Sequence, residues 1–169
     1  MNRKIFLKNV GIGTALTLVG GKLIAQIGAQ HEPPPLLIPL VKDFVIAGHG
    51  NFAKVKEMLQ ETPNLIYTKF DWGNGDYEAA IEGAGHVGNK EIANYLLEAG
   101  SRVTLYVLTM LGKTELVKPV LEQYPALIKA KGPHGFTLLH HAKVGGEDGK
   151  ELYAYLQKKG LKDDWIKLR

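Results

Sequence analysis

The sequence predicts an all-α protein whose helices are stacked in pairs. Four stretches share one pattern, in which a glycine and a polar start lead into apolar residues at helical spacing. The four stretches are 47–66, 84–103, 109–128 and 140–160. A unit that recurs every twenty to forty residues or so is typical of stacked repeats, because no single unit can bury its apolar face alone.

The ends of these stretches support the same fold class. The second and fourth stretches stop at Gly100 and Gly160, and glycine adopts the left-handed cap that ends a helix without strain. The first and third stop at Pro63 and Pro125, where proline cannot continue a helix and favours a turn. We therefore expect about four irregular helix-turn-helix repeats.

The first 29 residues have the organisation of an export signal. A basic head is followed by a weakly apolar middle and by small residues ending at Ala29. The middle is interrupted by glycines and by Lys22, which makes it too weak to predict a membrane-spanning helix. "RKIFLK" resembles the twin-arginine export motif, with Lys4 in the place of the second arginine. We expect a periplasmic or secreted protein that uses this route or the general secretory route.

Residues 30–38 predict a linker, and residues 39–169 the repeat domain. Successive prolines in "HEPPPLLIP" forbid a helix and favour an extended chain.

The formal charge of +4 lies entirely in residues 1–29, and the remainder carries 17 basic and 17 acidic residues. A neutral domain lacks the positive field that a nucleic-acid backbone requires, so no nucleic-acid partner is expected. The sequence has no cysteine, which excludes disulfides and thiolate metal sites.

Two motifs resemble a known repeat family. "GFTLLHHA" (135–142) is similar to the start of an ankyrin repeat, Gly-x-Thr-Pro-Leu-His-x-Ala, with Leu138 in place of proline. "GNKEIANYLLEAGSRV" (88–103) resembles the second half of the same repeat. The resemblance covers roughly residues 39–161 and implies an ankyrin-repeat solenoid, similar to exported bacterial ankyrin-repeat proteins.

The spacing of the repeats departs from that family. From Gly50 to Gly88 is 38 residues and from Gly88 to Gly112 is 24, whereas an ankyrin unit needs about 33. Too few residues remain for a projecting β-turn before the third unit. We therefore expect the third repeat to lack a full hairpin.

The resemblance gives a structural role to most residues around the histidine-rich stretch. It implies that the side chains of Thr137 and His140 bond to nearby backbone groups and fasten the start of the helix to its neighbour, with Gly135 and Leu139 completing the motif. Burying an imidazole whose nitrogens are hydrogen-bonded to the backbone costs less free energy than burying an unpaired one. His49 and His86 recur in matching settings, "AGHGN" and "AGHVGN", which also favours a structural role.

Five residues are candidates for contact with a partner. The stretch "FDWGNGDYE" (70–78) replaces the usual turn, and its glycines permit a finger that displays aromatic residues. His134 is predicted at a turn tip and His141 in the concave groove, both exposed. Aromatic residues in such places often dominate binding energy. The predicted partner-binding residues are Trp72, Asp76, Tyr77, His134 and His141.

The sequence favours a non-catalytic function. It contains no G-x-S-x-G, no H-E-x-x-H and no phosphate-binding loop. We predict a monomeric protein–protein interaction module without metal or cofactor, for which a co-exported protein is one candidate partner. The alternative is a small metal-dependent or acid/base enzyme, which would require a pocket where its ionisable groups converge. The residues of this alternative are Asp71, Asp76, Glu78, His86 and His134.

Overall fold

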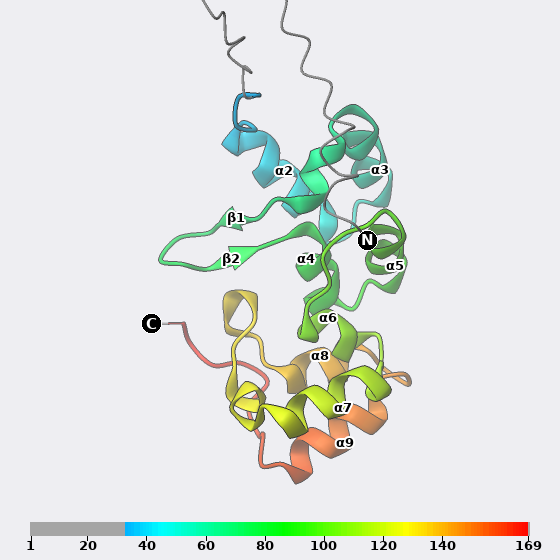
Figure 1. Ribbon diagram of the computed structural model, residues 1–169, viewed down its shortest axis with the longest axis vertical. Coiled ribbons are helices and arrows are strands. Elements are labelled where there is room, and N and C mark those ends of the chain that lie inside the picture. Colours follow the sequence, from blue (N-terminus) through cyan, green and yellow to red (C-terminus); the bar gives the residue numbers. More distant parts are fainter. Residues whose placement is uncertain (1–32, 169) are drawn as a thin grey trace, which may run out of the picture. The chain divides into compact units, whose positions relative to one another are not determined.

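The computed structural model describes residues 33–168, so the predicted export signal and the first residues of the predicted linker lie outside it. The described chain is mostly helical, as the all-α prediction requires. Its α-helices follow one another in four pairs (Figure 1). The pairs are α2 (Ile38–Gly48) with α3 (Phe52–Glu61), α4 (Ala80–Val87) with α5 (Lys90–Glu98), α6 (Leu105–Met110) with α7 (Thr114–Gln123), and α8 (Leu138–Val144) with α9 (Lys150–Lys158).

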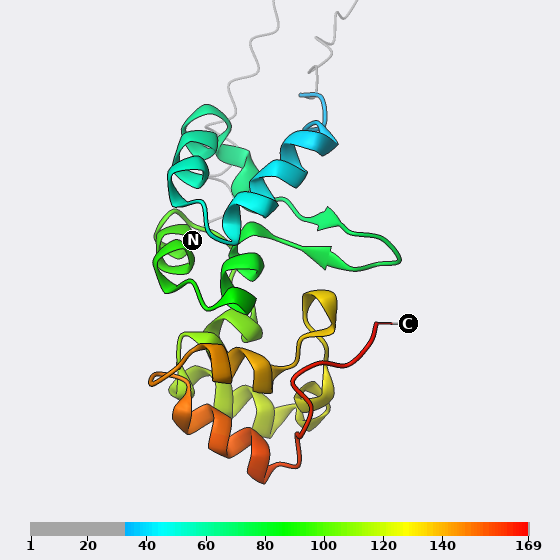
Figure 2. The same cartoon turned by 180° about the vertical axis from the view of Figure 1, so that it is seen from behind.

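The pairs pack in chain order. The first helices contact one another in the succession α2, α4, α6, α8, while α3 packs on α5 and α7 on α9. Figure 2 shows the same succession from behind. Residues from Pro35 onward make up one compact unit, and helix α2 begins at Ile38, just inside the predicted linker. None of the described helices is both long and apolar enough to cross a membrane.

Polar caps begin several of these helices. The side chains of Asn51 and Asn89 each accept a hydrogen bond of 3.0 Å from a backbone N–H in the first turn of α3 and α5. Thr104 and Thr137 cap α6 and α8 in the same way, at 3.5 and 3.4 Å. These caps satisfy N–H groups that have no partner inside the helix. They explain why these four helices start where they do.

Two apolar clusters hold the stack together. The first runs from α2 to α6 and the second from α6 to α9. At the α2–α4 contact the backbones come so close that a Cβ on Gly48 would lie 2.3 Å from the carbonyl oxygen of Ala80. Only glycine fits there, and this close approach brings the next residue, His49, against helix α4.

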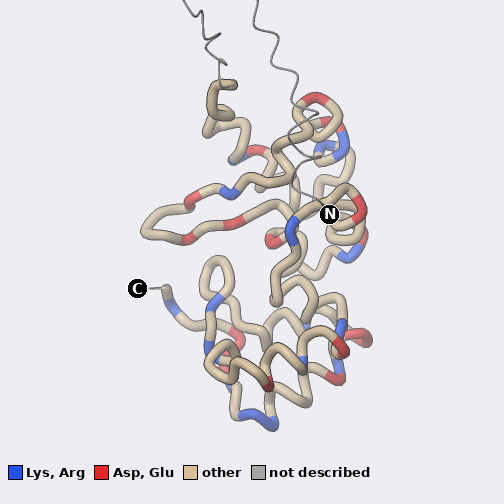
Figure 3. Tube along the Cα trace, in the orientation of Figure 1, with Lys and Arg blue, Asp and Glu red and all other residues tan. Residues whose placement is uncertain are grey.

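A β-hairpin projects from the stack between the first and second pairs (Figure 1). Strand β1 (Phe70–Asp71) pairs antiparallel with β2 (Tyr77–Glu78). The turn between them uses three residues with positive φ, at Gly73, Asn74 and Gly75, and the Asp71 side chain accepts a hydrogen bond from the Gly73 N–H at 2.8 Å. Acidic residues occur on both strands (Figure 3).

The later connections differ from this one. No strand is present in residues 99–104, which join α5 to α6, so the described chain has no hairpin before the third pair. Short 3₁₀ helices follow α3 and α7, namely η1 (Pro63–Tyr67) and η2 (Pro125–Lys129). A third, η3 (Pro133–Gly135), precedes α8. The C-terminal segment returns to η3, where Trp165 forms a β-bridge with Phe136.

Candidate metal centre

Three histidines and one glutamate converge beside the hairpin. We call His49, Glu78, His86 and His134 the His–Glu cluster; each offers one ligand atom, and these atoms all lie within 4.8 Å of one another. Nε2 of His86 is 3.0 Å from Nε2 of His49 and 2.9 Å from Oε1 of Glu78. Nε2 of His134 lies 3.3 Å from the other carboxylate oxygen, Oε2. Four side chains therefore meet through their polar atoms.

The four residues come from four different elements. His49 is the C-cap of α2, and His86 lies in the last turn of α4. Glu78 ends strand β2, and His134 belongs to η3. The stacking of α2 on α4 brings the first two together, while the hairpin and η3 reach the same point from outside the stack.

A glycine makes room for the first imidazole. A Cβ on Gly83 of α4 would lie 2.8 Å from Cε1 and 2.9 Å from Nδ1 of His49. The ring therefore rests directly on the helix backbone, where a methyl group would displace it. Nδ1 of His49 donates to the backbone oxygen of Val45 at 3.0 Å, which fixes the orientation of the ring.

His134 adopts an unusual backbone conformation. Its φ of 58° and ψ of 8° lie in the left-handed region, which costs a residue other than glycine about 1–2 kcal/mol. Asp76 offsets this cost by accepting from the His134 backbone N–H at 2.8 Å and from its Nδ1 at 2.7 Å. Trp165 Nε1 donates to the His134 carbonyl at 2.6 Å. Strained residues held this firmly are concentrated at functional sites.

His86 is held by aromatic stacking and by its backbone. Its ring stacks on Phe136 at 5.0 Å between centroids, and Phe136 stacks in turn on His140 at 4.2 Å. His140 Nε2 donates to the carbonyl oxygen of His86 at 2.8 Å. The ring therefore has little freedom to leave the cluster.

The hydrogen bonds of the outer nitrogens, Nδ1 of His49 and of His134, determine whether the inner nitrogens, Nε2, are free to bind a metal. Nδ1 of His49 donates to a carbonyl and Nδ1 of His134 to a carboxylate, so both carry the hydrogen. In a neutral ring the remaining nitrogen, Nε2, then presents a lone pair to the cluster. This pattern, an imidazole whose far N–H is bound by carbonyl or carboxylate, is the usual support of a metal-binding histidine.

Glu78 supplies a buried negative charge. Its side chain is fully buried, and Trp72 Nε1 donates to Oε2 at 2.8 Å. Burial opposes ionisation, but hydrogen bonds from His49 and His86 outweigh it and hold the pKa of Glu78 well below its usual range. The hydrogen bond to Glu78 in turn raises the pKa of His49 above its ordinary value, against the effect of burial. The carboxylate is therefore ionised and can only accept hydrogen bonds.

The polar atoms at the centre of the cluster are suited to a cation. A hydrogen on Nε2 of His86 can serve either His49 or Glu78, but it cannot serve both. In their neutral forms the rings of His49 and His134 would set an Nε2 lone pair against the carboxylate, so either a proton on the ring or a metal ion is required between them. Zinc bonds of about 2.0–2.2 Å place tetrahedral ligand atoms roughly 3.4 Å apart. Four contacts between polar atoms of the cluster, from 2.9 to 3.4 Å, are close to that spacing, and all four ligand atoms lie within 4.8 Å of one another.

Most of the alternative enzyme set comes together here, and one residue does not. Glu78, His86 and His134 are cluster members, and Asp76 orients His134. Asp71 instead bonds within the hairpin turn. The fourth ligand, His49, was predicted only as a structural residue, although its recurrence with His86 in matching repeat positions was a usable signal.

The predicted partner-binding residues differ in how far they are exposed. Tyr77 is exposed, with 55% of its surface accessible, and Trp72 is partly exposed although its indole N–H reaches Glu78. Asp76 and His134 bind each other. The prediction of an exposed His141 is wrong: it is fully buried because α8 packs on α4 and α6, where its ring meets Tyr106 at 5.2 Å.

The predicted structural residues make backbone contacts that support the fold. Thr137 is buried, and its Oγ1 donates to the carbonyl oxygen of Asp163 at 2.7 Å. Leu139 lies in the second apolar cluster. Gly135 has a φ of 84°, and a Cβ there would lie 2.2 Å from the carbonyl oxygen of Ile166. His140 donates to the backbone carbonyl oxygen of His86, so the histidine-rich stretch helps to hold one cluster residue in place.

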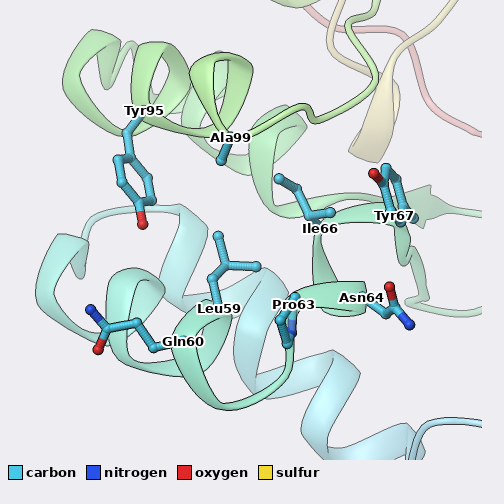
Figure 4. Close-up of a pocket in the computed structure, with 8 residues that line it drawn as sticks. All are labelled: Leu59, Gln60, Pro63, Asn64, Ile66, Tyr67, Tyr95 and Ala99. Carbon is cyan, nitrogen blue, oxygen red and sulfur yellow. The ribbon is translucent and has the colours of Figure 1, made fainter.

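A separate cavity of about 310 Å³ lies between the ends of α3 and α5 (Figure 4). No member of the His–Glu cluster lines it, and it contains no carboxylate, imidazole or lysine. Its lining residues are Leu59, Gln60, Pro63, Asn64, Ile66, Tyr67, Tyr95 and Ala99. The His–Glu cluster therefore lies apart from this cavity.

No family model matches the chain, and no curated protein is significantly similar to it. The chemistry of the His–Glu cluster is therefore the main guide to function.

Proposed function

We propose that the protein binds one divalent transition-metal ion, zinc first among them, through the His–Glu cluster. The ligands are Nε2 of His49, His86 and His134 and a carboxylate oxygen of Glu78. The observation that carries the proposal is the convergence of three imidazole nitrogens on a buried carboxylate, with the outer nitrogens of two rings already bonded elsewhere.

The donor set favours some metals over others. Imidazole suits zinc, copper and nickel, whereas calcium and magnesium prefer oxygen ligands throughout. Three nitrogens and one oxygen from the protein fill the four positions that zinc takes in a structural site. A structural or switching role therefore fits the donor set better than catalysis, which needs an open position.

A second candidate function is binding of a protein partner. It rests on exposed aromatic rings beside the cluster: Tyr77 on the hairpin and Trp165 on the C-terminal segment, 55% and 52% accessible. Metal binding and partner binding are compatible, because a metal can hold the surface that a partner contacts. Export to the periplasm or the medium and the ankyrin relationship remain predictions of the sequence.

Metal titration tests the proposal. The purified full chain, stripped with a chelator, is titrated with zinc in competition with a chromophoric chelator. We expect one ion per chain, and an affinity at least about tenfold lower in Glu78→Gln and in His86→Ala. Glu57→Gln changes an exposed carboxylate and is the matched control. Equal zinc affinity in the natural chain and Glu78→Gln would overturn the proposal.

A further inference from the structure

Two short segments outside the helical stack each supply one ligand. The hairpin, residues 70–78, provides Glu78, and the His134 loop, residues 132–136, provides His134. The other two ligands, His49 and His86, lie at the ends of packed helices. Figures 1 and 2 both show the hairpin and the loop projecting on the same side of the stack.

The hairpin has little stability of its own. Each strand has two residues, and an isolated two-stranded hairpin is at best marginally stable in water. None of its apolar side chains belongs to the buried core; Phe70 only packs against the edge. What keeps the hairpin in place must therefore be sought in its polar side chains.

The polar contacts of the hairpin lead to the metal ligands. Asp76 binds the backbone and ring of His134, and Glu78 contacts all three cluster histidines. Lys42 adds a weaker contact, its Nζ lying 5.6 Å from the Phe70 ring and 5.8 Å from the Trp72 ring. The polar attachment of the hairpin is thus concentrated at the His–Glu cluster, while strand β1 also packs against helix α2.

The His134 loop is attached to the C-terminal segment as well. The N–H of Ile166 donates to the carbonyl oxygen of Gly135 at 2.9 Å, and the N–H of Thr137 donates to the carbonyl oxygen of Asp164 at 3.0 Å. Inside the loop, the N–H of Gly132 donates to Phe136 at 2.8 Å. On the side facing the hairpin, the loop is joined through His134 to Asp76 and Glu78. The hairpin and the loop are thus joined to each other through His134, Asp76 and Glu78.

We propose that the metal ion acts as a clasp that fixes the hairpin and the His134 loop to the ends of α2 and α4. This inference rests on the proposed function and deepens it by assigning the ion a regulatory role. The bound cation joins Glu78 and His134 to His49 and His86. Without the metal ion, protons on the imidazoles must join them to Glu78 by hydrogen bonds, and the hairpin loses the metal bonds that are its strongest attachment. Metal occupancy therefore controls whether Trp72 and Tyr77 are presented in a fixed arrangement.

Hydrogen exchange of particular amides tests the clasp. The reporter amides are the backbone N–H of Trp72, which donates to the carbonyl oxygen of Asp76, and that of Gly132, which donates to the carbonyl oxygen of Phe136. Exchange is measured by mass spectrometry on the full chain with chelator and with zinc at 100 times its dissociation constant. An opening that releases the ion becomes about 100-fold rarer at that concentration, so both amides should exchange about 100-fold more slowly. The amide of Lys159 at the end of α9 should not change, because it frays independently of the cluster.

Two variants make the outcome decisive. Glu78→Gln removes a ligand on the hairpin, and His49→Phe removes a ligand on the stack while leaving the hairpin and the loop unaltered. Both should reduce the zinc-dependent slowing from about 100-fold to about tenfold or less at the same zinc concentration. Binding of one zinc ion with unchanged exchange at Trp72 and Gly132 would overturn the clasp and leave the proposed function standing. Absence of zinc binding would overturn both.

Discussion

Asp76 binds His134 twice, at the backbone N–H and at the ring, across 58 residues of sequence. One carboxylate oxygen accepts from the N–H at 2.8 Å and the other from Nδ1 at 2.7 Å. This pair fixes the left-handed backbone of His134 and also the tautomer of its ring. It connects the hairpin to the fourth helix pair and directs Nε2 toward Glu78.

Asp76→Asn is expected to weaken zinc binding without unfolding the protein. The new amide can still accept from the His134 N–H, but its NH₂ group then faces Nδ1. His134 would move its hydrogen to Nε2, the atom needed for the metal. Loss of such a supporting contact lowers metal affinity by about 10- to 100-fold. Competition titration with zinc measures the change.

Asp71→Asn is the matched control for that variant. It makes the same change of charge on the same hairpin, but Asp71 accepts its hydrogen bond from the turn N–H of Gly73 and not from His134. Its zinc affinity should stay within about twofold of the natural value, the scale expected of an exposed charge. If both variants weaken binding equally, the effect comes from hairpin charge and not from the orientation of His134.

Gly83→Ala is expected to separate metal affinity from stability. The new methyl would lie under 3 Å from the His49 ring, so the ring must move off α4 and out of the cluster. In the metal-free protein, alanine stabilises a helix interior by about 1 kcal/mol relative to glycine. We therefore expect zinc affinity to fall while the melting temperature in chelator is unchanged or higher. Gly50→Ala, where a Cβ meets nothing within 4 Å, should leave zinc affinity unaltered.

The helix pairs could be predicted from the sequence because the patterns that indicate a helix are local. Apolar residues at helical spacing, asparagine caps such as Asn51 and Asn89, and stop signals at glycine or proline each act within a few residues. Contacts between the hairpin and the His134 loop obey no such local rule. They depend on how far residues 70–78 reach from the stack, which is determined by the packing of whole helices.

The candidate site could be predicted from the sequence only in part. The set of Asp76, Glu78, His86 and His134 was recognisable as a group of ionisable residues, but nothing in the sequence showed that it would converge. His49 could have been added, because equivalent positions in neighbouring repeats lie side by side and His49 matches His86. His141 was misplaced because the resemblance to an ankyrin repeat put its position in the concave groove, and only the packing of α8 on α4 and α6 shows that its ring is enclosed.

Trp165→Phe is expected to loosen the His134 loop. The change removes the 2.6 Å hydrogen bond from the indole N–H to the His134 carbonyl, while the bridge to Phe136 can persist. A hydrogen bond of this kind contributes about 0.5–1.5 kcal/mol, which corresponds to a zinc affinity roughly two- to tenfold lower. Competition titration measures it, with Tyr124→Phe, an exposed aromatic outside the cluster, as the control. An unchanged affinity would show that the C-terminal segment does not position His134.

His141 is expected to make the metal-free protein sensitive to acid. Burial, together with the nearby His140 and His86, lowers its pKa to about 4, against a favourable hydrogen bond to Thr137. The unfolded chain takes up a proton near pH 6.5 and the folded chain only near pH 4, so this stability is complete above pH 6.5 and is lost as the pH falls. The loss amounts to about 3 kcal/mol. His141→Phe, which fills the same site beside Tyr106 without titrating, should lack this part of the decline in urea unfolding measured from pH 7 to pH 4 with chelator. An identical decline in both proteins would contradict the assignment.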